Sequence, residues 1–252
     1  FSISLVFKAR TYSIYLKRPR MTKFSSVILA GGKGKRFSEH LPKQFCSLLE
    51  KPIIEYSLKT LSQTPGIEEI VIVCEKEYRE HFQLPGSFPY PIKFALPGKE
   101  RSDSVFNGLK CCDPNIPFII VHDAARPFIE REFLEDAMQK ALVNGACAVG
   151  VPLKFTVKSL KENHTVEKTL NREKIWEIQT PQVLKKSLMF EGFSHIQKHQ
   201  ISITDDVSLA EVLGYTVKLQ LGSYQNIKIT TQEDLLFAEM ILNQKKHLLK
   251  SS

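Results

Sequence analysis

The sequence of 252 residues predicts an α/β protein built on a mostly parallel β-sheet with helices on both faces. Three observations lead to this prediction. Short apolar runs alternate with helical patterns along the chain. The run at residues 118–121, "FIIV", is apolar without a break, which is typical of a strand buried on both faces. Hydrophobic residues make up 42% of the chain, enough for a sizeable core.

The alternation covers roughly the first 153 residues. A helical stripe runs from Ile53 to Leu61, and a second helix is expected at residues 130–143, where Asn144-Gly145 ends it as a C-cap pair. The predicted strands are residues 25–29, 69–74, 92–96, 118–121 and 146–153.

The pattern changes at about residues 154–176, which are charged and β-prone, with an Asn163-His164 turn in the middle. We expect a two-stranded arm that protrudes from the sheet. Because an isolated ribbon of two strands is barely stable, the arm is expected to pack on another chain.

Helical patterns resume near Leu184 and at residues 205–213, and short strands are expected at 216–221 and 227–229. Thr230-x-x-Glu233 predicts a capping box for a last helix, residues 233–242 or longer.

The net charge of +8 is unevenly distributed. Five cations and no acid lie within residues 1–20, so the remaining chain carries +3. A mildly basic body suits a pocket for phosphorylated small molecules, and it has no aromatic and basic interleaving of the kind that binds nucleic acid. We expect residues 1–20 to be a disordered extension and residues 21–252 to form one domain. The alternative is an organelle transit peptide, whose composition residues 1–20 resemble.

The compartment is suggested by two features. The chain has five cysteines, two of them adjacent, and no C-x-x-C, which favours a reducing compartment over a disulfide framework or a zinc site. No run of 18 apolar residues is present, so no membrane span is expected. We therefore expect a bacterial cytoplasmic protein, or a plastid protein if residues 1–20 belong to a transit peptide.

A glycine-rich loop, "LAGGKGKRF", follows the first predicted strand. A P-loop would need a second glycine five residues after Gly31 or Gly32, but those positions hold Arg36 and Phe37. A dinucleotide fingerprint would need a third glycine three residues after Gly34, where Phe37 stands. The loop therefore belongs to neither of these phosphate-binding motifs.

Other strands also end in glycine, a cation or a lone carboxylate. "PGKERSDS" follows the third predicted strand, "HDAARP" follows "FIIV", and "NIK" precedes the last helix. Ligands of open parallel sheets gather at the carboxyl ends of the strands, so these segments together predict a polyphosphate site with one acid, Asp123, for a metal. Each of these segments, taken alone, has an ordinary structural explanation. Asp123, taken alone, fits a structural role as well as a functional one.

Six motifs in order resemble one known family: "LAGGKGKRF…PKQF", "GKERSDSV", "HDAARPF", "NREKIWEIQTPQ", "TDDVSLAE" and "NIKIT". They are similar to the cytidylyltransferases of the methylerythritol phosphate pathway, over about residues 25–239. The resemblance implies a Rossmann-like nucleotidyltransferase fold. It also implies transfer of CMP from CTP to 2-C-methyl-D-erythritol 4-phosphate, with release of pyrophosphate, in isoprenoid precursor synthesis.

The resemblance also implies roles for single residues. It implies a homodimer in which Arg172 of the arm completes the partner's site, and Mg²⁺ or another divalent cation held by Asp123. The implied catalytic cations are Arg36, Lys43 and Lys228. The implied CTP contacts are Ala30, Gly31, Gly32, Gly34, Gly98, Ser104 and Ala124. The implied acceptor contacts are Arg126, Thr156, Arg172 and Thr180.

Two departures from the family and three alternatives remain. The first loop reads Ala-Gly-Gly, where many members have Ala-Ala-Gly. The arm has Phe155 before Thr156, where the family usually has Asp. The nearest alternative is ribitol-5-phosphate cytidylyltransferase, which shares the CTP loop. A binding protein without catalysis is the second, although Arg36, Lys43, Asp123 and Lys228 are all present. A Rossmann dehydrogenase is the third, and the missing third glycine argues against it.

Overall fold

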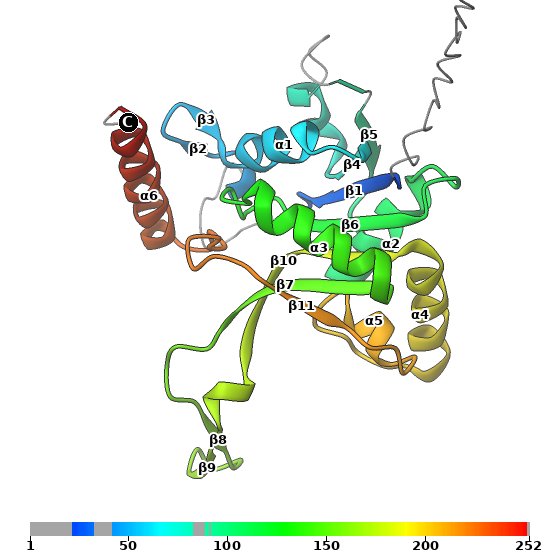
Figure 1. The fold of residues 1–252 in the computed structure, drawn as a ribbon, viewed down its shortest axis with the longest axis vertical. Helices are drawn as coiled ribbons and strands as arrows, with labels where there is room; N and C mark the ends of the chain where they lie inside the picture. Colours follow the sequence, from blue (N-terminus) through cyan, green and yellow to red (C-terminus); the bar gives the residue numbers. More distant parts are fainter. Residues whose placement is uncertain (1–21, 33–41, 83–88, 91, 251–252) are drawn as a thin grey trace, which may run out of the picture.

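The computed structural model describes residues 22–32, 42–82, 89–90 and 92–250 (Figure 1). Residues 1–20 and the candidates Gly34 and Arg36 lie outside these ranges. Seven strands form the central sheet, and the described part of the chain has no other sheet of more than two strands. Their order across the sheet is β11 (Lys218–Leu221), β7 (Ala146–Pro152), β10 (Trp176–Lys185), β6 (Phe118–Asp123), β1 (Phe24–Leu29), β4 (Ile67–Val73) and β5 (Ile92–Ala95).

The sheet is mostly parallel, as the alternation of strands and helices predicts. β1 pairs in parallel with β4 and β6, β4 with β5, and β7 with β11. β10 is antiparallel to both of its neighbours, β6 and β7. All five strands predicted before the arm are present, with ends that differ by up to two residues.

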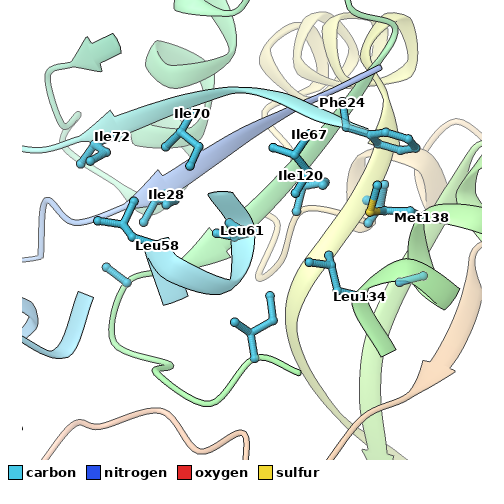
Figure 2. Packing of buried hydrophobic residues seen from close by; sticks show 14 of the residues in the cluster. Phe24, Ile28, Leu58, Leu61, Ile67, Ile70, Ile72, Ile120, Leu134 and Met138 are labelled. Atoms are coloured by element: carbon cyan, nitrogen blue, oxygen red, sulfur yellow. The ribbon is translucent and has the colours of Figure 1, made fainter. Parts of the chain in front are cut away.

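Helices cover both faces, and each face has its own apolar core. On one face, α1 (Ile53–Gln63) and α3 (Arg131–Asn144) pack on the sheet; Figure 2 shows Leu58 and Leu61 of α1 with Leu134 and Met138 of α3 against strand isoleucines. On the other face lie α2 (Arg101–Cys111), α4 (Lys186–His199) and the short α5 (Ser208–Glu211). Gly145 ends α3 with a φ of 85°, which confirms the predicted C-cap.

Several predicted elements are wrong. The helix expected near Leu184 is present as α4, which begins at Lys186, but the strand before it, β10, was not predicted. Helix α2 was not predicted. The helix at residues 205–213 shortens to α5, and residues 227–229 form no strand. The small hairpin of β2 (Ser47–Leu48) and β3 (Lys51–Pro52), and the 3-10 helices η1 (Lys43–Phe45) and η2 (Lys76–Phe82), were also missed.

The last helix, α6 (Gln232–Lys250), has a capping box one residue later than predicted. Asp234 accepts the backbone N–H of Thr231 at 2.9 Å, and the Thr231 hydroxyl accepts the N–H of Asp234 at 3.3 Å. Thr231 and Asp234 therefore replace Thr230 and Glu233, because α6 begins at Gln232, which makes Thr231 its N-cap and Asp234 its N3 residue. No helix in the described part of the chain combines the length and apolarity that a membrane crossing needs.

The predicted arm lies between β7 and β10. It contains the hairpin of β8 (Lys158–Leu160) and β9 (Val166–Thr169), then the 3-10 helix η3 (Arg172–Lys174), and it extends away from the sheet (Figure 1). Its side chains are largely exposed, and Phe155 at its base is 76% exposed.

Candidate active site

A pocket of about 400 Å³ lies where the carboxyl ends of β1, β5 and β6 meet. Three loops that follow these strands form its walls, and the segment before α6 closes it. The structure thus brings Leu29 at the end of β1 together with Lys228 in the segment before α6, although the two lie far apart in sequence. The lining residues are Leu29, Gly31, Gly32, Lys43, Gln44, Gly98, Lys99, Glu100, Arg101, Ser104, Asp123, Ala125 and Lys228.

The backbone of the glycine loop, in its described part, is held by contacts with neighbouring side chains. A Cβ on Gly31 would lie 2.4 Å from Cβ of Pro97, so only glycine allows the two loops to approach this closely. A Cβ on Gly32 would meet no protein atom within 4 Å. The buried side chain of Gln44 donates to the carbonyls of Ala30 (2.5 Å) and Gly32 (3.2 Å). Gly32 therefore lines the pocket with its backbone bare.

The second loop leads into α2. The hydroxyl of Ser104 accepts the backbone N–H of Gly98 at 2.9 Å. A Cβ on Gly98 would lie 2.2 Å from Cβ of Asp103, so this close turn also needs glycine. Glu100 and Asp103 form a capping box that begins α2 next to the pocket.

Asp123 is the buried carboxylate of the pocket and lies between two cations. Its Oδ2 accepts Nζ of Lys228 at 2.7 Å, and its Oδ1 accepts Nε (3.3 Å) and Nη2 (3.2 Å) of Arg101. Burial favours a raised pKa, but the charges of Arg101 and Lys228 outweigh it and hold the pKa of the Asp123 carboxyl well below its usual range. The carboxylate is therefore charged at neutral pH.

Arg101 and Asp206 were missed by the sequence analysis as site residues, although both lie in quoted motifs. Arg101 donates to both oxygens of Asp206, at 2.7 and 2.8 Å, in a bidentate pair. Asp206 is buried, and its backbone N–H donates to the side chain of Gln182. The pairing joins residues 105 positions apart, so no local pattern could have shown it.

A buried chain of hydrogen bonds lies directly behind Asp123. The Thr180 hydroxyl lies 3.0 Å from the backbone N of Asp123 and 3.1 Å from Nδ1 of His122. Nε2 of His122 lies 3.0 Å from the carbonyl of Arg126. Burial lowers the pKa of His122 to about 4, so the imidazole is neutral at pH 7.

The other predicted residues fall into three groups. Ala30 and Ala124 are buried, and their N–H groups bond to carbonyls of Val73 and Leu29. The guanidinium of Arg126 donates to the carbonyl of Asn226 at 2.7 Å, outside the pocket lining. Thr156 and Arg172 lie on the exposed arm and do not line the pocket; Arg172 donates to the carbonyl of Lys154 at 3.0 Å.

The donor set limits how a divalent metal can bind. Within the described residues, no group of three or more His, Cys, Asp or Glu side chains could hold a metal. Two carboxylates line the pocket: Asp123 is buried, and Glu100 caps the start of α2. This set fits Mg²⁺, which is commonly bound by one or two carboxylates together with substrate phosphates and water.

The chain is similar to known proteins over nearly its whole length. A family model described as 2-C-methyl-D-erythritol 4-phosphate cytidylyltransferase matches residues 24–244. The chloroplastic enzyme of that name from Oryza sativa is 46% identical over 224 residues, which cover 88% of this chain and 75% of that protein. The one from Chlamydia pneumoniae is 37% identical over 222 residues, covering 88% of this chain and all of the relative.

Solved structures agree with the sequence relatives. The 4-diphosphocytidyl-2C-methyl-D-erythritol synthase of Anaerococcus prevotii superposes with a TM-score of 0.78 at 30% identity, over 88% of this chain and 99% of that one. The 2-C-methyl-D-erythritol 4-phosphate cytidylyltransferase of Thermus thermophilus gives 0.71 at 26% identity, over 87% and 98%. This chain belongs to the 2-C-methyl-D-erythritol 4-phosphate cytidylyltransferase family.

Proposed function

We propose that this chain transfers CMP from CTP to 2-C-methyl-D-erythritol 4-phosphate, a step of isoprenoid precursor synthesis. The products are 4-diphosphocytidyl-2-C-methyl-D-erythritol and pyrophosphate. The observation that carries the proposal is the ionised Asp123 beside Lys228, in a pocket walled by the glycine loop, in a chain of this family. The relatives named above favour this acceptor over ribitol 5-phosphate.

The reaction needs charge stabilisation more than proton transfer. The acceptor phosphate is ionised at neutral pH, so its oxygen attacks the α-phosphorus of CTP without a general base. Negative charge accumulates on the phosphate oxygens as pyrophosphate leaves in line with the attack. We assign Lys43 and Lys228, together with Arg36 of the glycine loop, to stabilise this charge. Lys43 and Lys228 both line the pocket, which supports their assignment.

The glycine loop and the start of α2 are assigned to CTP. Backbone N–H groups in a bare loop suit phosphate oxygens, and Gly32 leaves open space where a side chain would stand. Gly98 and Ser104 line the same pocket and are assigned to the nucleoside. Asp123 would hold Mg²⁺ together with the triphosphate. The ion supplies positive charge to the phosphate oxygens during transfer.

We also propose a homodimer in which the arm of one chain completes the acceptor site of the other. Two features support this. Thr156 and Arg172 do not line the pocket of their own chain. The arm also exposes apolar side chains, including Phe155, Leu160 and Val166, which favours burial against a second copy. Arg172 of the partner would then bind the phosphate of the acceptor.

Pyrophosphate release from CTP and Mg²⁺ tests the function. We expect release with methylerythritol phosphate and none with ribitol 5-phosphate. Release with ribitol 5-phosphate alone would overturn the acceptor assignment and keep the CTP site. Release with neither, from folded protein that still binds CTP, would favour a binding protein without catalysis.

A further inference from the structure

We propose that Tyr224 is a positioning residue that holds the root of the arm and thereby orients Arg172 for the site of the partner chain. We define the root as residues 152–154 and 172–175, where the arm leaves strands β7 and β10. The inference rests on the proposed function and its homodimer. It adds a residue that does not line the pocket to the acceptor half of the reaction.

The arm leaves the sheet on two paired segments. At the root, the backbone N–H of Leu153 donates to the carbonyl of Ile175 at 3.0 Å. Nη1 of Arg172 donates to the carbonyl of Lys154, also at 3.0 Å. Beyond the root, β8 and β9 pair with each other and their side chains are largely exposed. A rotation of the root therefore moves the hairpin and Arg172 together.

Tyr224 contacts the root in two ways. Its hydroxyl donates to the carbonyl of Pro152, the last residue of β7, at 2.6 Å. Nζ of Lys154 lies 3.3 Å from the centroid of the Tyr224 ring, which is a cation–π contact. The carbonyl of the same Lys154 accepts the guanidinium of Arg172. Tyr224 is thus linked to Arg172 through a single residue, and it fixes that residue relative to the end of β7.

The loop that carries Tyr224 is itself fixed to the sheet. The backbone N–H of Gly222 donates to the carbonyl of Gly150 in β7 at 2.8 Å. The side chain of Gln179 in β10 donates to the carbonyl of Ser223 at 3.0 Å. Tyr224 therefore holds the arm from a support that belongs to the sheet.

Tyr224 also lies four residues before Lys228, so a change at this position has two routes to the reaction. One route runs through the arm to the site of the partner, and the other runs through the loop to the pocket of the same chain. Tyr224 does not line that pocket, and its two contacts with the root lie on the side of the arm. These contacts favour the route through the arm.

Tyr224→Leu removes the hydroxyl and the aromatic face, whereas Tyr224→Phe keeps the face for Lys154. We expect Tyr224→Leu to lower kcat/KM for methylerythritol phosphate by about tenfold, because two modest contacts are lost, and Tyr224→Phe to lower it by about threefold. The Kd of CTP should change by less than about twofold, because CTP binds at a separate place in the pocket. An unchanged kcat/KM in Tyr224→Leu would overturn the proposal.

Tyr215→Leu is the matched control. Tyr215 is 48% exposed and Tyr224 is 41% exposed, so the two rings are similarly placed at the surface. Tyr215 precedes β11, whose first residue lies beside the start of β7, and the arm leaves from the other end of β7. Tyr215→Leu should keep full activity.

Mixed dimers decide between the two routes. Tyr224→Leu is unfolded and refolded with either Lys228→Gln, which changes the pocket, or Arg172→Gln, which changes the arm, and activity is read well below KM for methylerythritol phosphate. If Tyr224 acts through the arm, the mixture with Lys228→Gln contains dimers with one intact site, and it should reach about a quarter of the activity of the unaltered protein or more. The mixture with Arg172→Gln has no intact site and should stay at the mean of its two variants. The reverse pattern would overturn the proposal.

A last measurement needs no turnover. Protons above an aromatic ring are shielded, so the ¹H NMR signal of the Lys154 ε-methylene should lie upfield in the unaltered protein and in Tyr224→Phe. It should return to the usual lysine position in Tyr224→Leu. An unshifted signal in the unaltered protein would overturn the proposal, and this result decides the matter if Tyr224→Leu does not fold. Because no substrate is present, failure of the Tyr224 contact is distinguishable from failure of the proposed function.

Discussion

The nucleotide pocket and the arm differ in how their charged side chains are held. In the pocket, Asp123 has two cations within 3.3 Å, and Arg101 is shared with the buried Asp206. On the arm, Arg172 is exposed and pairs with no carboxylate among the described residues; it donates to the backbone carbonyl of Lys154. In the proposed function a single chain organises the CTP half of the reaction, and the acceptor half needs Arg172 from a second chain.

Lys228→Gln should give the largest effect of the pocket changes. The change removes a cation 2.7 Å from Asp123. We expect kcat to fall by about 10²–10³-fold, because this is the usual cost of removing one group that stabilises the negative charge of a transition state. The fold should persist because Arg101 still compensates Asp123. Lys198→Gln, an exposed lysine on α4, is the control and should keep full activity. An unfolded Lys228→Gln variant would show that the cation is structural.

Arg172→Gln tests the arm in the same way. We expect kcat/KM for methylerythritol phosphate to fall by roughly 10–10²-fold through the loss of a bidentate phosphate contact, while CTP affinity is kept. Steady-state kinetics and a CTP titration check this. A matching loss of CTP affinity would place Arg172 in the nucleotide half and break the comparison.

Arg101→Met should show that the pocket is built around a buried charge. Asp206 would lose its bidentate partner, and we expect a loss of about 3 kcal/mol in the free energy of unfolding, measured with urea. Arg131→Met is the control, because the exposed pair of Arg131 and Glu135 is worth about 0.5 kcal/mol or less. Equal losses in the two variants would contradict the proposed importance of the Arg101 network.

The stability of the pocket wall should depend on pH through His122, whose pKa is about 4 when folded and near 6.5 when unfolded. The unfolded chain therefore binds the proton first. Stability should fall by about 1.4 kcal/mol per pH unit as pH drops from 6.5 toward 4, from this group alone. Arg126 and Lys228 near the ring favour the neutral form, and Asp123 opposes them. His122→Asn should have a flatter profile over this window; an unchanged slope would contradict the prediction.

The sequence predicted the fold better than it predicted the site. Strands with continuous apolar runs were found, but β10 was missed because Gln179, Thr180 and Gln182 are buried polar residues within it. These residues form hydrogen bonds across the site. The alternation of apolar residues that marks a strand is therefore lost where the strand contributes to the site. Asp123 and Lys228 stood out as residues at strand ends and loops. Their mutual contact, and the link from Arg101 to Asp206, join distant segments and needed the structure.

Mixing two impaired variants tests the division between pocket and arm most directly. A Lys228→Gln chain has a defective pocket and an intact arm, whereas an Arg172→Gln chain has the reverse. After unfolding and refolding together, half of the dimers should be mixed, each with one intact site, and activity should return to about a quarter of that of the unaltered protein. Activity no higher than the mean of the two variants would contradict the claim that Arg172 acts in the site of the partner.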